Sequence, residues 1–223
     1  MALKETLIWL CSLAVLFFSA ASHETVLQDC SSKAQLLDRL SADLKVVVEC
    51  GEIPPSDWSP QRTASLLLSM RNLTETLHKH QLNECRGAEP EQCPEAEVPD
   101  NGGLACVTVA DKQRNTTTRY CKPLCNHGFD FGFLRRSRLY DECGAQTRFK
   151  WNTQYVGGNK LAVCNETPIQ ISGAETAYFP KDCMTSKESS EPVNTIESDF
   201  IAELKKEGIE GEMKSFCLVC GRS

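Results

Sequence analysis

Apolar residues recur with the spacing of one helix face in two stretches of the N-terminal third of the chain. In residues 26–48 the apolar stripe consists of Leu37, Leu40, Leu44 and Val47. In residues 60–80 it consists of Leu66, Met70, Leu73 and Leu77. This period predicts two amphipathic helices, whose stripes we expect to pack in a core rather than to bind a ligand.

Turn-forming residues mark the ends of both predicted helices. Gly51 and the prolines that follow it stop the first helix. Ser59 suits the N-cap of a second helix that begins at Pro60, since proline is tolerated at the first helical position. The loop between the helices is short and rich in proline, so residues 23–88 are predicted to form an antiparallel helical hairpin.

The pattern changes between Cys93 and Cys164, where turn residues separate short runs of apolar and polar residues. The segments LACVTV (104–109) and TTRYC (117–121) are typical of two short strands, and Asn115 lies near the tip of their polar connection. This order predicts a β-hairpin.

The chain after residue 164 is mostly polar. Residues 166–179 have room for one or two strands. A helix is predicted after Asn194, because Glu197 follows it at the spacing of a capping box, and Gly208 would end that helix. Its apolar face would consist of Ile196, Phe200 and Leu204. Helices and strands segregated in this way predict the α+β class.

The N-terminus has the features of a secretory signal peptide. Lys4 precedes an apolar run over residues 7–18, and small residues over 19–22 follow. The run is too short for a transmembrane anchor, which needs about 20 apolar residues. Cleavage after Ala21 or Ser22 is expected to release a secreted, extracellular protein with no membrane span. The predicted organisation is a signal peptide (1–22), a helical hairpin (23–88), a disulfide-rich β module (89–164) and a C-terminal segment with one helix and a CxxC motif (165–223).

The cysteine count fits a secreted protein. Of the 13 cysteines, Cys11 lies in the signal peptide, which leaves 12. An even number in an oxidising compartment indicates disulfide bonds rather than metal ligands. The four histidines do not complete a zinc-type spacing, so no metal and no other cofactor are expected.

Two further features concern the surface. Three N-glycosylation sequons begin at Asn72, Asn115 and Asn165. The net charge of −6 argues against nucleic acid or an anionic membrane as the main partner.

The disulfide-rich module resembles a sushi module, also called a complement control protein module. Its opening, Cys93-Pro followed by Pro99-x-Asn-Gly, is similar to that family, as is Cys125 just before Gly128-Phe129. Cys143, Trp151 and Cys164 resemble the remaining landmarks. The chain as a whole also looks like a group of secreted fish proteins. The sushi resemblance covers about a third of the chain and implies a small β fold whose core is filled by the tryptophan.

The resemblance also implies a disulfide pairing. First-to-third and second-to-fourth bonds correspond to Cys93–Cys143 and Cys125–Cys164. Cys106 and Cys121 are extra to the family pattern; since they flank the predicted hairpin, we pair them with each other.

Six cysteines lie outside the module. Cys30 and Cys85 fall at adjacent ends of the helical hairpin and are predicted to pair. Cys217 and Cys220 are predicted to bond to separate partners, drawn from Cys50 and Cys183. Because three of the six precede the module and three follow it, at least one bond must join the two segments if all twelve cysteines pair and the module pairs internally.

Arg135, Arg136 and Arg138 are the strongest local charge in the module. One hypothesis is a basic docking patch for an acidic protein or a sulfated glycan, and a second is a proprotein cleavage site after Arg138. A solvated surface loop is the simplest interpretation.

No nucleophile–base motif or phosphate-binding loop is visible, so the sequence does not predict an enzyme. The favoured function is non-catalytic binding of an extracellular protein, which rests on analogy with sushi modules. One alternative is a thiol-disulfide oxidoreductase that uses Cys217 and Cys220, and another is a helical signalling ligand. The sequence does not identify the partner.

Overall fold

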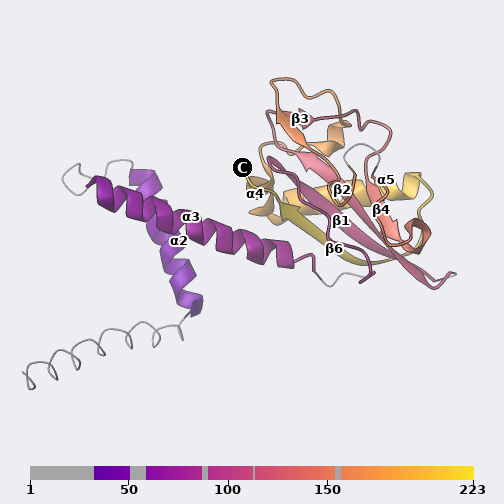
Figure 1. Ribbon diagram of the computed structural model, residues 1–223, viewed down its shortest axis with the longest axis horizontal. Helices are drawn as coiled ribbons and strands as arrows, with labels where there is room; N and C mark the ends of the chain where they lie inside the picture. The colour runs from indigo at the N-terminus through magenta and orange to yellow at the C-terminus, as the bar shows by residue number, and fades with distance from the viewer. Residues whose placement is uncertain (1–32, 51–58, 87–89, 113, 154–156) are drawn as a thin grey trace, which may run out of the picture. The chain divides into compact units, whose positions relative to one another are not determined.

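The computed structural model describes the chain except for residues 1–32, 51–58, 87–89, 113 and 154–156 (Figure 1). It combines helices with antiparallel sheets, so the predicted α+β class is confirmed. The chain divides into two compact units, Met1–Leu66 and Leu67–Ser223. The predicted signal peptide lies outside the described residues. None of the described helices is long and apolar enough to cross a membrane.

Two helices form where the apolar spacing predicts them. α2 spans Lys33–Cys50 and α3 spans Pro60–Asn83. The hydroxyl of Ser59 accepts a hydrogen bond from the backbone N–H of Arg62 at 3.1 Å, which confirms the predicted N-cap of α3. The arrangement of the two helices as a hairpin stays a prediction.

The apolar stripes of these helices are only partly covered. The prediction that they pack in a core is therefore wrong for several of their residues. The members that remain 41–50% exposed are Leu37, Val47, Leu66, Met70 and Leu77. α3 is held instead near its C-terminal end, where the buried Gln81 accepts a hydrogen bond at Oε1 from the backbone N–H of Cys220 at 2.8 Å. This bond satisfies a strand N–H at the sheet edge and fixes the end of the helix there.

A four-stranded antiparallel sheet forms the centre of the second unit. β1 (Gly102–Asp111) and β2 (Thr116–Cys125) pair along their whole length, which confirms the predicted hairpin. β4 (Asp141–Gly144) pairs with β2 and β6 (Glu212–Cys220) pairs with β1, so the strand order is β4-β2-β1-β6. Asn115 lies in the β1–β2 turn with a φ of 49°, a conformation that asparagine tolerates better than most residues.

The other elements surround this sheet. β3 (Phe129–Phe131) and β5 (Cys164–Glu166) form a separate antiparallel pair. The helices of the C-terminal segment are α4 (Cys183–Lys187) and α5 (Ser190–Lys206). Short 3₁₀ turns occupy Ala145–Thr147 (η3) and Glu175–Ala177 (η4).

α5 packs across one face of the main sheet (Figure 1). Side chains of a strand alternate between its two faces, so Ala105 and Val107 of β1 share a buried cluster with Phe200 of α5. The helix begins at Ser190 rather than after Asn194, because a proline in its first turn does not interrupt helical hydrogen bonds. Gly208 follows the helix with a φ of 77°, as predicted.

A buried ion pair also joins α5 to β2. Lys122 is 1% exposed, and its Nζ lies 2.7 Å from both carboxylate oxygens of Glu203 and 3.0 Å from Oγ1 of Thr176. Burial lowers the pKa of Lys122, and the hydrogen bond to Glu203 opposes that effect. A lysine buried on the sheet face is compatible with folding because this partner compensates its charge.

β6 is an element that the sequence did not predict. It comes from the C-terminal segment but pairs with β1 from Gly103 to Ala110. The main sheet therefore takes strands from both sides of the boundary predicted at residue 164.

Five disulfide bonds cross-link the described part of the chain. The predicted bonds within the module are confirmed: Cys93–Cys143, Cys106–Cys121 and Cys125–Cys164. Trp151 is 7% exposed and packs in the buried cluster that contains Cys106 and Cys143, in agreement with its expected core role.

The outer bonds correct one predicted pair. Cys85 bonds to Cys217 rather than to Cys30, so Cys217 does not pair with Cys50 either. The physical reason is that Gln81 and the end of α3 lie against β6, which brings Cys85 to the sheet. The Cys85–Cys217 bond joins the segments before and after the module, as the cysteine parity requires. Cys30 and the side chain of Cys50 lie outside the described residues.

The strand geometry of β6 explains why the two cysteines of the CxxC motif have different partners. Residues three apart on a strand point to opposite faces. Cys217 accordingly bonds to Cys85 on one face, and Cys220 bonds to Cys183 on the face that α5 covers. The motif therefore does not form the internal disulfide of a thioredoxin-type site.

Candidate binding surface

The predicted basic docking patch is wrong as a set of three exposed arginines. Arg135 is 4% exposed, and its Nη2 lies 2.9 Å from Oδ2 of Asp141. Arg138 lies 2.9 Å from the other oxygen of the same buried carboxylate. Arg136 alone is exposed. Asp141, the first residue of β4, thus forms ion pairs with two of the three arginines. The sequence alone does not reveal these ion pairs.

Arg136 nevertheless belongs to a surface formed by two adjacent loops, residues 132–136 and 169–173. The backbone N–H of Arg135 donates a hydrogen bond to the carbonyl oxygen of Ser172 at 2.7 Å, and the two loops run parallel there. The guanidinium of Arg135 points into the protein, as does the side-chain amide of Gln170, which donates to two backbone carbonyl oxygens. Neighbours of an inward-pointing residue in an extended loop point outward.

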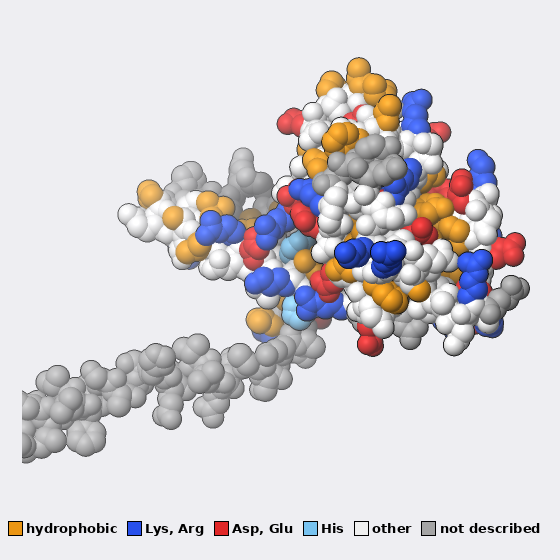
Figure 2. Space-filling view, turned by 45° about the vertical axis from the view of Figure 1, so that its right-hand side comes forward, with side chains coloured by type: hydrophobic (Ala, Val, Ile, Leu, Met, Phe, Trp, Pro, Cys, Tyr) orange, Lys and Arg blue, Asp and Glu red, His pale blue; other side chains and the backbone are white. Residues whose placement is uncertain are grey.

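The outward-pointing neighbours are mostly apolar. Their exposed fractions are 49% for Phe133, 68% for Leu134, 62% for Ile169 and 59% for Ile171. Figure 2 shows hydrophobic side chains gathered at the top of the molecule, where Figure 1 places β3 and its neighbouring loops. We call these four residues together with Arg136 the loop surface. Single exposed apolar residues are ordinary, but a contiguous group on paired loops is typical of an interaction site.

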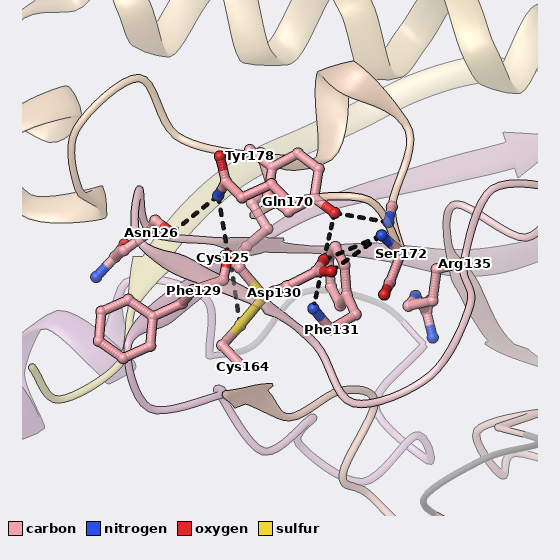
Figure 3. The surroundings of a disulfide bond; sticks show 12 residues. Cys125, Asn126, Phe129, Asp130, Phe131, Arg135, Cys164, Gln170, Ser172 and Tyr178 are labelled. Atoms are coloured by element: carbon pink, nitrogen blue, oxygen red, sulfur yellow. Dashed lines mark hydrogen bonds between the residues drawn. A yellow bond between two sulfur atoms is a disulfide. The ribbon is translucent and has the colours of Figure 1, made fainter. Parts of the chain in front are cut away.

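Asp130 holds the second loop, residues 169–173, in place through hydrogen bonds (Figure 3). This residue of β3 is 6% exposed, and its carboxylate accepts hydrogen bonds from the backbone N–H groups of Phe131, Ile171 and Ser172 at 2.8–3.2 Å. The hydroxyl of Tyr178 donates to the same carboxylate. One charged group therefore organises the backbone of the second loop.

Ionisation in this cluster follows from its hydrogen bonds. Burial alone would raise the pKa of Asp130, but the hydrogen bonds from Tyr178, Ile171, Ser172 and Phe131 outweigh burial and lower it. Burial and the hydrogen bond to Asp130 raise the pKa of Tyr178 to about 12. The tyrosine therefore stays protonated as a donor, and the aspartate stays ionised as an acceptor, at physiological pH.

Replacing Asp130 by asparagine is expected to lower the free energy of unfolding at pH 7 by about 2 kcal/mol, because hydrogen bonds to a charged acceptor are lost. The folded pKa of Asp130 lies below its unfolded value of about 3.9, so the contribution is complete above that value and is lost as the pH falls through the folded pKa. Urea denaturation should show the difference between the two proteins shrinking from about pH 5 toward pH 2.

The exposed Asp43 of α2 provides a matched control for this prediction. Its replacement by asparagine should change stability by less than about 0.5 kcal/mol at either pH. A D130N protein whose stability differs from wild type by the same amount at pH 7 and at low pH would contradict the assigned role of the carboxylate.

The Cys125–Cys164 disulfide fixes the base of the loop surface to the main sheet (Figure 3). Cys125 ends β2, and Cys164 begins β5, which pairs with β3 in a register that places Phe131 opposite Cys164. Since β3 carries Asp130, the covalent bond limits the movement of the whole hydrogen-bonded cluster relative to the sheet.

The remaining predicted sites lie apart from this surface or add little to it. The three sequon residues Asn72, Asn115 and Asn165 are all exposed, so each could accept a glycan without rearrangement. In the described part of the chain no group of three or more histidine, cysteine, aspartate or glutamate side chains is arranged to hold a metal ion.

Comparison of the chain with protein-family models, with curated proteins and with solved structures found no match. The resemblance of residues 93–164 to a sushi module therefore stays a prediction. The loop surface has to be interpreted from its own geometry and chemistry.

Proposed function

We propose that the protein is an extracellular, non-catalytic binding protein that engages a partner protein through the loop surface. The observation that carries this proposal is the exposure of Phe133, Leu134, Ile169 and Ile171 on loops whose backbones are fixed from below. The signal-like N-terminus, the sequons and the five disulfides support an extracellular setting.

The support beneath the loops favours binding by a surface that is already formed. Asp130 and Arg135 hold the two loops with buried hydrogen bonds, and Cys125–Cys164 ties their base to the sheet. A surface that is ordered before binding loses less conformational entropy on association than a mobile one. More of the free energy gained by burying its apolar side chains is then available for affinity.

The charge of the loop surface indicates what kind of partner fits it. Only Arg136 offers a positive charge there, since Arg135 and Arg138 are paired with Asp141. A sulfated glycan would require a cluster of cations that are free to bind it. On the loop surface Arg136 is the one arginine that is not paired with Asp141. An apolar protein surface with one carboxylate opposite Arg136 is complementary, and phenylalanine and arginine are enriched in protein interfaces.

Site-specific photo-crosslinking tests this proposal. A photoreactive amino acid is placed at Leu134 or at Ile171 of the full chain, which is then incubated with cells and medium from a tissue that expresses the protein. Both positions should crosslink to the same partner protein. An excess of unlabelled wild type should compete, and the double variant Leu134→Ser, Ile171→Ser should compete at least tenfold less well.

Met184 in α4 is a suitable control position, since it is 53% exposed and lies outside the loop surface. A partner that crosslinks equally from Met184, or that the double-serine variant displaces as well as wild type does, would argue against the loop surface as the contact. Crosslinks to lipid rather than to protein would show that the loop surface contacts a membrane and not a partner protein.

A further inference from the structure

A pocket of about 410 Å³ lies in the second unit, away from the loop surface and sharing no residue with it. It is bounded by the C-terminal end of α3, the chain segment 95–100 and the face of the main sheet opposite α5. Its apolar lining includes Leu82, Leu104 and Val219, together with the disulfide-bonded Cys85 and Cys106. The lining combines these apolar side chains with charged groups, which are Glu95, Glu97, Asp100, Arg119 and Arg222. A pocket of this size that joins apolar surface to a few charged groups is suited to a small molecule.

Arg119 of β2 is the polar group that gives this pocket a specific chemistry. It is 8% exposed and lines the pocket. Its Nη2 donates to the carbonyl oxygen of Cys85 at 3.0 Å and lies 3.8 Å from the Sγ of Cys217. Its Nε is buried and, among the described residues, has no hydrogen-bond partner.

Burial lowers the pKa of Arg119, and the negative charge of Glu95, which also lines the pocket, opposes that effect without forming an ion pair. Within the described chain no carboxylate lies within ion-pair distance of Arg119, whereas the other two buried cations, Lys122 and Arg135, each have one. Arginine does not lose its proton in proteins, so the charge is permanent. A buried, permanently charged group without an ion-pair partner is a costly arrangement in a folded protein unless an anion reaches it.

The rim of the pocket limits which anions can enter. Glu95, Glu97 and Asp100 all line it. Glu95 pairs with Arg86 at 2.7 Å, and Glu97 lies 3.7 Å from Lys160, so surface partners screen two of these charges. A single carboxylate can pass such a rim, whereas a phosphate or a dicarboxylate would bring a second negative charge close to it.

We propose that this pocket binds a small apolar monocarboxylate, with its carboxylate on Arg119 and its hydrocarbon body against Leu82, Leu104 and Val219. The planar guanidinium suits a carboxylate because two parallel N–H groups can donate to its two oxygens. The three apolar side chains would cover the hydrocarbon body of the ligand. This inference does not depend on the function proposed for the loop surface.

Isothermal titration calorimetry on the full chain, with octanoate as the probe, tests the proposal. Octanoate should bind with a dissociation constant in the micromolar to millimolar range. Octanol has the same hydrocarbon body without the charge and should bind at least tenfold more weakly. Inorganic phosphate, which has the charge without the body, should not bind. Equal binding of octanol and octanoate, or no binding of octanoate, would overturn the proposal without any variant.

Two variants separate the roles of charge and cavity. Arg119→Met should weaken octanoate binding at least tenfold, while Arg114→Met on the exposed β1–β2 turn should leave it unchanged. If Arg119→Met does not fold, Ala96→Trp is the second test, because Ala96 is only partly buried and lines the pocket from a segment outside the strands. A folded Ala96→Trp protein that still binds octanoate with wild-type affinity would place the ligand elsewhere and refute the pocket.

Discussion

Replacing Asp141 by asparagine should lower the free energy of unfolding by about 3–5 kcal/mol, measured by urea denaturation at pH 7. Asp141 is fully buried and is the ion-pair partner of both Arg135 and Arg138 at 2.9 Å. An asparagine keeps the shape but removes the charge. The guanidinium of Arg135, which is 4% exposed, would then be a buried cation without a counter-charge.

Asp111 supplies the matched control for this substitution. It also pairs with an arginine three residues away, Arg114 at 3.6 Å, but its side chain is 34% exposed. Because water screens such a pair, Asp111→Asn should cost less than about 1 kcal/mol. Equal effects of the two substitutions would show that burial does not determine the contribution of the Asp141 pair.

A double substitution tests the mechanism of the destabilisation. If the cost of Asp141→Asn comes from the stranded charge of Arg135, then adding Arg135→Met should recover part of the lost stability. If the cost comes only from the lost hydrogen bonds of Asp141, the second substitution should destabilise further, because it also removes the bond from Arg135 to the carbonyl oxygen of Leu161.

The sequence predicts those elements of this fold whose signals are local. The periods of α2 and α3, the cap at Ser59 and the β1–β2 hairpin all depend on residues close together in the chain. Parity among the outer cysteines adds one long-range statement, that a bond joins the segments on either side of the module. The Cys85–Cys217 bond fulfils it.

β6 and the partner of Cys85 could not be predicted in the same way. The strand holds a CxxC motif and is buried at its C-terminal end only, so its apolar alternation is short. Its pairing with β1 spans more than 100 residues of chain. Because Cys217 lies on β6, the pairing of β6 with β1 determines which cysteines it can contact. Cys85 therefore bonds to Cys217, although the predicted helical hairpin would place it close to Cys30.

The candidate sites show a similar limit. Sequence identified Arg135, Arg136 and Arg138 as a charge cluster but could not show that the buried Asp141 forms ion pairs with two of them. The apolar part of the loop surface was overlooked because Ile169 and Ile171 resemble one face of a strand. Arg119 was missed because a single arginine in a strand has no distinguishing pattern; only its burial without an ion pair does.

Removing the Cys85–Cys217 bond should have the other large effect. This bond closes a sequence separation of 132 residues, the longest of the five. In the chain-entropy model a cross-link contributes about 3 kcal/mol for a loop of about 15 residues and nearly 5 kcal/mol for a loop of about 100. The Cys93–Cys143 and Cys183–Cys220 bonds shorten the loop that Cys85–Cys217 closes, so its contribution should lie between these two values. Cys85→Ala with Cys217→Ala should therefore destabilise the protein more than Cys106→Ala with Cys121→Ala, whose separation is 15 residues.

Proteolysis provides a second measurement of the same bond. A protease site placed in residues 87–89 separates the chain that contains Cys85 from the chain that contains Cys217. After cleavage the two fragments should migrate together on a gel without reductant and separate when reductant is added. In the Cys85→Ala, Cys217→Ala protein they should separate in both cases, because the covalent link is gone. Fragments of that variant that stay joined without reductant would mean that another cysteine pair links the two segments, and the contribution assigned to Cys85–Cys217 would then be too large.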